Sequence, residues 1–317
     1  MIVNILLLVL GFVFLIKGAD LFIDGASSTA QNFKVSKMLI GLTIMAFGTS
    51  APEFAVSMSA LASGNTDMVL GNVIGSCILN ILLILGVAAV IHPIKIQNNT
   101  LKKEMPLCIL MSTLLVILFL DVKLGNGVLN QITRADAFVI LLFFTVFLYY
   151  LIALAKQKKE QDENEQPKMK LGKSILLVLI GLAGIVIGSD LVVDNASSIA
   201  TILGLSERII ALTIVAFGTS LPELVTTIVS SKKGEQDLLL GNIIGSNIFN
   251  ICIVLGIPVA IFGTITPASF QMIDLIMLIG SSIILFLFAA TKKTINRLEG
   301  SLMLLAFALY YIFVFVI

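Results

Sequence analysis

Gly48-Thr49-Ser50-Ala51-Pro52-Glu53 interrupts a long apolar run with one carboxylate and two hydroxyl groups. The pattern returns 170 residues later as Gly218-Thr219-Ser220-Leu221-Pro222-Glu223. A charge inside an apolar segment is expensive enough that it usually marks a functional site. Because the full set occurs twice at a fixed offset, helix packing alone explains it poorly. The two hexapeptides are therefore the first candidates for a binding site.

The composition predicts an integral membrane protein. Of the 317 residues, 58% are hydrophobic and 12% charged, with a mean hydropathy of +1.09, which leaves too little polar surface to cover a soluble globule. The net charge of +1 and the lack of a basic stripe argue against nucleic acid as a partner. Cys77, Cys108 and Cys252 show no CxxC spacing, so neither a disulfide framework nor a zinc site is predicted.

Apolar runs of about 20 residues are long enough to cross a bilayer, and the chain has ten of them. They lie at residues 2–25, 38–61, 68–91, 105–121, 136–155, 174–196, 209–230, 238–261, 270–290 and 300–317. The predicted fold is an all-α integral membrane protein with ten transmembrane helices. Because the first run lacks a basic leader and a cleavage site, we expect a retained span rather than a signal peptide.

One polar segment, residues 156–173, separates five spans from the other five. We therefore predict a first repeat at 1–155, a cytoplasmic linker at 156–173 and a second repeat at 174–317. The halves match without a gap, through pairs such as Gly18 and Gly188, Asp24 and Asp194, Gly64 and Gly234, and Asn80 and Asn250. Since each half has an odd number of spans, the second copy should insert upside down. Such inverted repeats are typical of transporters with a site at the bilayer midplane.

The distribution of basic residues predicts the orientation, because lysine and arginine are retained on the cytoplasmic side. With the N-terminus outside, sixteen of the twenty lie in inner loops, and Lys17 lies near the inner end of the first span. Only Lys123, Arg134 and Arg208 fall outside. We expect a multi-pass plasma membrane protein with both termini outside and the linker in the cytoplasm.

The prolines of the two motifs should break their helices. Pro52 has no N–H, so we expect carbonyl groups near residues 46–48 to lack helical partners and to be available to cations. Thr49 and Glu53 are four residues apart and share one helix face, as do Thr219 and Glu223.

The next helix of each half repeats the four-residue spacing in Ser76 and Asn80, and in Ser246 and Asn250. Oxygen ligands with no nearby thiolate or imidazole suit a hard cation such as calcium, sodium or magnesium. Two ionised glutamates carry a charge of about −2, which one Ca²⁺ or several Na⁺ ions can neutralise, and a proton would compete with the metals.

Other polar residues have structural explanations. Asp20, Asp24, Asp190 and Asp194 lie near helix ends, where an acid costs little. Asp67 and Asp237 precede their helices and are predicted to be N-terminal caps. Glu104 and Asp274 should lie in first turns, where the helix dipole favours acids. His92, beside a proline, is predicted to lie at the surface.

GTSAPE followed by GNVIGSCILN, and GTSLPE followed by GNIIGSNIFN, resemble the two alpha repeats of the sodium/calcium exchanger family, in the cation/calcium antiporter superfamily. The specific match covers residues 38–81 and 208–251, and the ten-span layout covers the whole chain. The chain is most similar to prokaryotic members with two inverted repeats. The long calcium-sensing loop of animal relatives is absent from the linker.

The resemblance implies the role of each ligand. Glu53 and Glu223 match the central acids that bind Ca²⁺, with Thr49 and Thr219 adding oxygens. The flanking Na⁺ sites match Ser50, Ser76 and the carbonyl of Ala46, and, in the second copy, Ser220, Ser246 and the carbonyl of Ala216. Asn80 and Asn250 match the remaining central positions.

Potassium-dependent relatives carry an aspartate where Asn250 stands, so the resemblance predicts no K⁺ co-transport. Proton/calcium exchangers favour a GNxxE arrangement over GTSxPE, which also points to sodium. By family analogy the first and sixth helices would slide against the other eight.

We therefore expect a Na⁺/Ca²⁺ antiporter that exports Ca²⁺ by alternating access, with Ca²⁺ and Na⁺ as transported ions and no cofactor. The alternatives are a Ca²⁺/H⁺ or other divalent-cation exchanger, and a channel. An intramembrane enzyme is a remote alternative, since HExxH and any nucleophile–base pair are missing. We expect the partners of the antiporter to be the transported ions and the lipid bilayer. The sequence is compatible with a monomer and does not define the oligomeric state.

Overall fold

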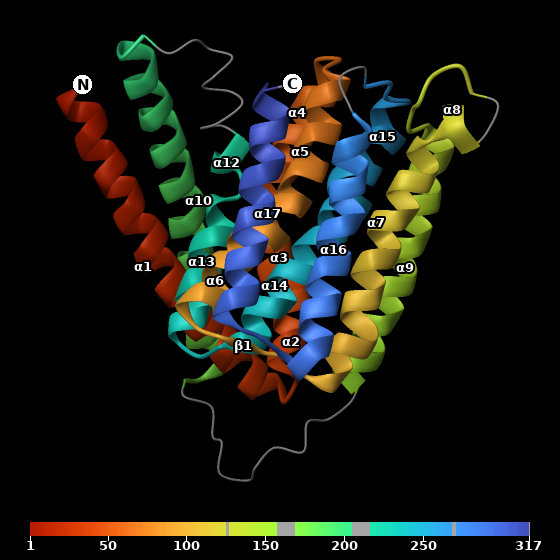
Figure 1. Ribbon diagram of the computed structural model, residues 1–317. Helices are drawn as coiled ribbons and strands as arrows, with labels where there is room; N and C mark the ends of the chain where they lie inside the picture. The colour runs from red at the N-terminus through yellow and green to blue at the C-terminus, as the bar shows by residue number, and fades with distance from the viewer. Residues whose placement is uncertain (125–126, 157–168, 205–215, 268–270, 317) are drawn as a thin grey trace. The chain divides into compact units, whose positions relative to one another are not determined.

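The computed structural model describes residues 1–124, 127–156, 169–204, 216–267 and 271–316. The regular structure is almost entirely helical, as predicted (Figure 1). The first half contains α1 (Ile2–Phe33), α2 (Lys37–Ile40), η1 (Gly41–Met45), α3 (Ala46–Thr49), α4 (Ala51–Ala62), α5 (Thr66–Leu79), η2 (Asn80–Leu85), α6 (Gly86–Ile91), β1 (Ile94–Lys95), η3 (Thr100–Glu104), α7 (Met105–Phe119), α8 (Asp121–Leu124) and α9 (Arg134–Lys156). The second half contains α10 (Leu171–Ile202), α12 (Ala216–Gly218), α13 (Leu221–Lys232), α14 (Gln236–Phe249), η5 (Asn250–Leu255), α15 (Gly256–Phe262), α16 (Met272–Lys292), β2 (Thr294–Ile295) and α17 (Arg297–Val316). The η elements are π-helices, and the two-residue strands β1 and β2 pair antiparallel.

Within the described residues, seven helices are long and apolar enough to cross a membrane. They are Ile2–Phe33, Thr66–Ile91, Arg134–Lys156, Leu171–Ile202, Gln236–Phe262, Met272–Lys292 and Arg297–Val314. The predicted run 38–61 is a bent helix pair, Lys37–Thr49 and Ala51–Ala62. The predicted run 105–121 contains the shorter α7. The predicted run 209–230 begins outside the described residues, and most of the predicted linker also lies outside them.

The chain divides into two compact units, and each takes segments from both halves of the sequence. Unit 1 comprises Met1–Pro52 and Leu154–Asn242. Unit 2 comprises Glu53–Ala153 and Ile243–Ile317. Contacts between the two sequence halves are therefore found inside each unit.

In unit 1, α1 packs backbone to backbone against α10. A Cβ on Gly18 would lie 2.8 Å from the carbonyl oxygen of Gly181, and one on Gly11 would lie 2.9 Å from that of Gly188. Residue numbers at the contacts rise along α1 while they fall along α10, so the two helices run antiparallel (Figure 1). Small residues at such positions let membrane helices approach closely and gain van der Waals contact.

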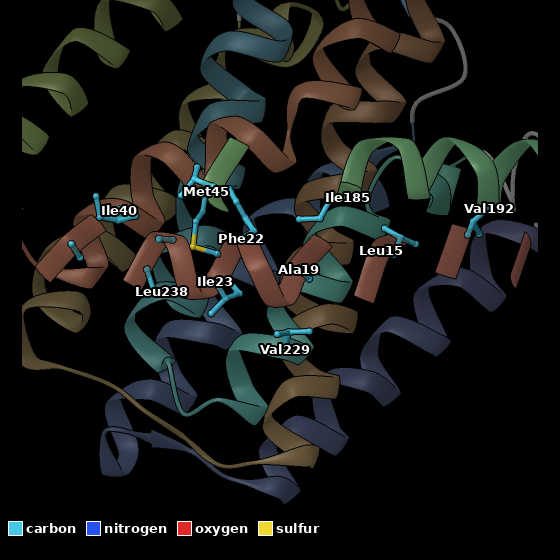
Figure 2. Packing of buried hydrophobic residues seen from close by; sticks show 13 residues of the cluster. Leu15, Ala19, Phe22, Ile23, Ile40, Met45, Ile185, Val192, Val229 and Leu238 are labelled. Atoms are coloured by element: carbon cyan, nitrogen blue, oxygen red, sulfur yellow. The ribbon is translucent and has the colours of Figure 1, made fainter. Parts of the chain in front are cut away.

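Large side chains fill the space beside these glycines. Leu15, Phe22 and Ile23 of α1 are fully buried together with Ile185 of α10 (Figure 2). Met45, the last residue of η1, belongs to the same cluster (Figure 2). The core of unit 1 thus positions the end of the first motif helix against α1.

In unit 2, residues at equivalent positions of the two halves contact each other. The hydroxyl oxygens of Ser112 and Ser282 are 3.2 Å apart. The amide nitrogen of the Asn247 side chain donates to the carbonyl oxygen of Cys77 at 3.1 Å. Both pairs are separated by 170 residues, so the repeats pack here with local two-fold character.

The turn between the motif helix and the next helix is the same in both copies. Gly64 and Gly234 adopt φ angles of 79° and 72°. These values lie in the left-handed region that glycine enters without steric penalty. The glycine shared by both halves is explained by this turn.

Several predictions about isolated acids require correction. The cap of α5 is Asn65, whose side chain accepts from the N–H of Met68, and Asp67 lies within the first turn. Glu104 does not lie in a first turn, because the π-helix η3 begins earlier, and its side chain is buried beside Tyr150. Asp274 does lie in the first turn of α16 and forms a capping box.

His92 is exposed, as predicted. Asp20 and Asp24 lie 3.4 and 2.8 Å from the amino group of Lys233, which explains them as surface ion-pair partners. Pairs this exposed contribute little to stability.

The glycine contact between α1 and α10 generates a prediction. A Cβ on Gly181 would lie 2.5 Å from the amide nitrogen of Phe22, so Gly181→Ala forces the helices apart and should lower the free energy of unfolding by about 1–3 kcal/mol. The three buried cysteines provide a thermal readout, because a thiol-reactive dye reacts only on unfolding. Gly280→Ala, with no atom within 4 Å of the new Cβ, is the matched control and should leave the melting temperature unchanged. Equal melting temperatures for both variants would contradict the close packing.

Candidate functional site

Both motif helices break immediately before their prolines. In the first copy α3 ends at Thr49 and α4 begins at Ala51. In the second copy α12 ends at Gly218 and α13 begins at Leu221. The helix breaks were predicted from the missing proline N–H, and the structure confirms them.

One of the carbonyl groups expected to lose its helical partner keeps it. The carbonyl of Ala46 keeps a helical partner, because it accepts from the N–H of Ser50 at 3.1 Å. The group that loses its partner is the carbonyl four residues before each proline. For Pro222 this is Gly218, whose oxygen accepts instead from the Ser189 hydroxyl at 3.0 Å.

Unit 1 brings residues of both motifs together around Glu223. The Glu223 side chain has no exposed surface, and its Oε1 accepts a hydrogen bond from the Ser50 hydroxyl at 3.1 Å. The two residues are 173 positions apart in the chain. A hydroxyl of the first motif therefore serves the carboxylate of the second.

Asn242 connects the same motifs through its side-chain amide. Its Oδ1 lies 3.1 Å from the Thr49 hydroxyl, which also lies 3.1 Å from the carbonyl oxygen of Met45. Its Nδ2 donates to the Thr226 hydroxyl at 3.3 Å. One buried amide thus orients Thr49 and ties α14 to α13.

The other predicted residues of the second motif lie at the break itself. Thr219 is half-buried, and Ser220 is buried directly before α13. Ala216 is the first residue of α12. Ala216 and Ser220, two of the three predicted Na⁺ ligands of the second copy, thus lie within one short segment, whereas Ser246 lies in α14.

Unit 2 holds the first glutamate. Glu53 is fully buried in α4, and its backbone carbonyl accepts from the Asn72 side chain at 2.9 Å. The same amide nitrogen lies 2.9 Å from the Ser57 hydroxyl oxygen. Asn72 thus fixes the turn of helix that carries Glu53.

The predicted central amides of unit 2 lie at the first residues of π-helices. Asn80 begins η2 and Asn250 begins η5, and single π-turns of this kind often occur at functional sites. The Asn80 amide nitrogen donates to Oδ1 of Asn247 at 3.0 Å. Neither side-chain polar atom of the fully buried Asn250 has a hydrogen-bond partner among the described residues. Ser76 and Ser246 are buried one turn earlier.

Three asparagines outside the predicted site residues position that site. Asn72 and Asn242 position the motif helices, and Asn247 orients Asn80. A signal for the first two was present, because the Gly-Asn pair before each Gly-Ser occurs in both halves at the same offset. Asn247 has no such signal, because its equivalent is Cys77.

The polar side-chain atoms of these residues are all oxygen or amide nitrogen. Among the described residues no group of three or more His, Cys, Asp or Glu side chains is arranged to hold a metal. Sparse carboxylates with hydroxyl and amide oxygens suit a hard cation that binds and leaves, rather than a tightly held transition metal.

Comparison with known proteins places these features in a family. The model of the sodium/calcium exchanger protein family matches residues 3–153 and 173–316. The sodium/calcium exchanger MaX1 of Methanosarcina acetivorans is 34% identical over 99% of both chains, and the inner membrane protein YrbG of Escherichia coli is 36% identical over 87% of this chain and 86% of its own. A solved structure of the sodium-calcium exchanger NCX_Mj superimposes with a TM-score of 0.85 at 33% identity, over 98% of this chain and 97% of that one.

The role of Asn242 can be tested through stability. Asn242→Ala removes the acceptor for Thr49 and the donor to Thr226, and it leaves buried hydroxyls with poorer partners. We expect a loss of about 1–3 kcal/mol in unfolding free energy, measured by thermal exposure of the cysteines. Asn195→Ala is the matched control, since among the described residues that amide donates within its own helix, to the Leu191 carbonyl at 2.7 Å. A loss no greater than that of the control would show that Asn242 does not tie the motifs.

Proposed function

Because this chain belongs to the sodium/calcium exchanger family, we propose that it is a K⁺-independent Na⁺/Ca²⁺ antiporter that exports Ca²⁺ by alternating access. The family and its structural representative are transporters rather than enzymes. The observation that carries the proposal is the fully buried carboxylate of Glu223 bonded by Ser50 of the other motif. An acid in such a place is the natural partner of a passing cation.

We assign Ca²⁺ to the two glutamates and the threonines of their motifs. Glu223 and Glu53 are both fully buried, and the Ser50 hydroxyl donates to Glu223 within unit 1. Calcium favours carboxylate oxygens, whereas Na⁺ is satisfied by neutral hydroxyl and carbonyl oxygens. The flanking serines, the carbonyls of Ala46 and Ala216, and the amides of Asn80 and Asn250 are therefore proposed as the Na⁺ and central positions.

The proposed topology is ten spans in two inverted repeats of five, divided by a cytoplasmic linker at 156–173. The antiparallel course of α1 and α10 supports the inversion, because these helices hold equivalent places in the two halves. The contact of Ser112 with its equivalent Ser282 also supports it. Multiple apolar helices show a multi-pass membrane protein, and the lysine distribution supports a plasma membrane location with both termini outside.

The K⁺ independence rests on Asn250. An amide contributes an oxygen without a charge, so the centre has two formal negative charges instead of the three that an aspartate would give. The side-chain oxygen of the fully buried Asn250 is available to coordinate a cation, since both polar atoms of this amide lack hydrogen-bond partners among the described residues. Fewer negative charges leave no need for an additional K⁺.

Two transport alternatives remain as outcomes of the test. A Ca²⁺/H⁺ or other divalent-cation exchanger would use the same buried carboxylates with a proton as the counter-ion. A channel would need no counter-ion. The hydrogen bonds of Ser50, Thr49 and Asn242 favour neither alternative.

The flux of Ca²⁺ under separate ion gradients tests the function. Proteoliposomes loaded with Na⁺ should take up Ca²⁺ when an outward Na⁺ gradient is imposed. Replacing K⁺ by choline on both sides should leave the rate unchanged. Equal uptake driven by a pH gradient in Na⁺-free buffer would identify a proton exchanger, and uptake without any counter-ion would identify a channel.

Substitution of the glutamates tests the site. Glu53→Gln and Glu223→Gln keep the side-chain shape and remove a charge, so each should abolish the rise in melting temperature on adding Ca²⁺. At 100 times the dissociation constant, binding stabilises the wild-type protein by about 2.7 kcal/mol. Glu104→Gln is the matched control, because that acid is equally buried and hydrogen-bonded by Tyr150, and it should keep the full calcium response. Calcium stabilisation that survives in both motif variants would remove the assignment.

A further inference from the structure

Helix α13 has a polar face that the ligands described above do not account for. Thr226, Thr227 and Ser230 follow Glu223 along this helix, and all four side chains have no exposed surface. Leu221, Val225 and Val229 occupy another face and pack against the core of unit 1. The polar residues are therefore buried on the side of the helix turned away from that core.

Three of the polar residues form a ladder. Glu223, Thr227 and Ser230 are spaced by four and then three residues, which places them on one helix face over two turns, about 10 Å long. The ladder runs toward the C-terminal end of α13, where the unpaired carbonyls of a helix favour a cation.

The two hydroxyls of the ladder lack internal partners. Neither Thr227 Oγ1 nor Ser230 Oγ has a hydrogen-bond partner among the described residues, although both atoms are buried. Several other threonines of this protein donate to a preceding carbonyl, as Thr29 does to that of Gly25 and Thr226 does to that of Pro222, both at 2.7 Å. A buried hydroxyl without a partner is destabilising, so two in succession point to a ligand that comes and goes.

The first copy lacks this arrangement, and the difference has an identifiable cause. There Asn72 donates to Ser57, the equivalent of Thr227. In the second copy Asn242 donates to Thr226 instead, where the first copy has Val56, and this leaves Thr227 without the asparagine. The equivalent of Ser230 is Ala60, which has no hydroxyl.

We propose that Thr227 and Ser230 form an additional Na⁺ subsite on α13, one to two turns beyond Glu223, which the ion occupies on its way to or from that carboxylate. The proposal rests on the Na⁺/Ca²⁺ antiporter function. Neutral hydroxyls replace part of the hydration shell of a monovalent cation, whereas Ca²⁺ needs the carboxylates that this stretch lacks. The first copy lacks this subsite, since Asn72 bonds Ser57 there and Ala60 stands in place of Ser230.

The test measures Na⁺ binding by itself, in the full-length protein. In Ca²⁺-free buffer, added Na⁺ should raise the melting temperature of the wild type. In the double variant Thr227→Val with Ser230→Ala, the Na⁺ concentration for half of this effect should rise about threefold to tenfold, the loss expected from two neutral oxygen ligands. The Ca²⁺ concentration for half-maximal stabilisation without Na⁺ should stay within about twofold of the wild type.

Two further variants separate ligand loss from misfolding. Thr227→Ser keeps the hydroxyl and should keep the wild-type Na⁺ response even if the double variant folds poorly. Thr113→Val is the matched control, since that hydroxyl donates to the Ile109 carbonyl at 2.8 Å within its own helix, and its Na⁺ response should be unchanged.

An unchanged Na⁺ response in the double variant would overturn the subsite and assign the two hydroxyls to a bound water. Equal weakening of Na⁺ and Ca²⁺ would also overturn it, because it would show a general disturbance of Glu223. Failure of the antiporter function itself is distinguishable, since the wild type would then show no Ca²⁺ flux driven by a Na⁺ gradient.

Discussion

Burial of the Glu223 carboxylate is the constraint on which the rest of unit 1 depends. A charged group without exposed surface is stable only if donors or a cation compensate it. The structure places the Ser50 hydroxyl against it, and Ser50 is available there because α3 ends one residue earlier. The proline of each motif, the break in each helix and the packing of α1 against α10 all serve to hold these few oxygens in an apolar environment.

The two copies of the repeat share a plan but differ in detail. Ser189 donates to the carbonyl that Pro222 leaves free, whereas the equivalent residue in the first half is Ala19. Asn72 and Asn242 stand at equivalent positions and bond to different residues of their motif helices. The two sides of a membrane differ in ion concentration, so a transporter benefits from asymmetry between its two halves. These differences between the copies make this protein asymmetric.

Much of this could be predicted from the sequence. The apolar runs, the motif helices and their breaks at Pro52 and Pro222 follow from hydropathy and from the missing proline N–H, both local properties. The carbonyl of Ala46 keeps its helical partner for a local reason as well, since the orphaned group lies four residues before the proline. Glu104 does not lie in a first turn as predicted, because the π-helix η3 that precedes α7 has no simple sequence signal.

The sequence by itself determined which chemistry is present: a duplicated set of carboxylates, hydroxyls and amides in apolar helices, which is enough to indicate hard-cation transport. Only the tertiary structure decided which of these groups meet. Ser50 bonds Glu223 and Asn242 bonds Thr49 across more than 170 residues, and Asn247 bonds both Asn80 and Cys77. Such pairings depend on how helices from the two halves pack, and helix packing is set by the sum of many small contacts rather than by any local pattern of residues.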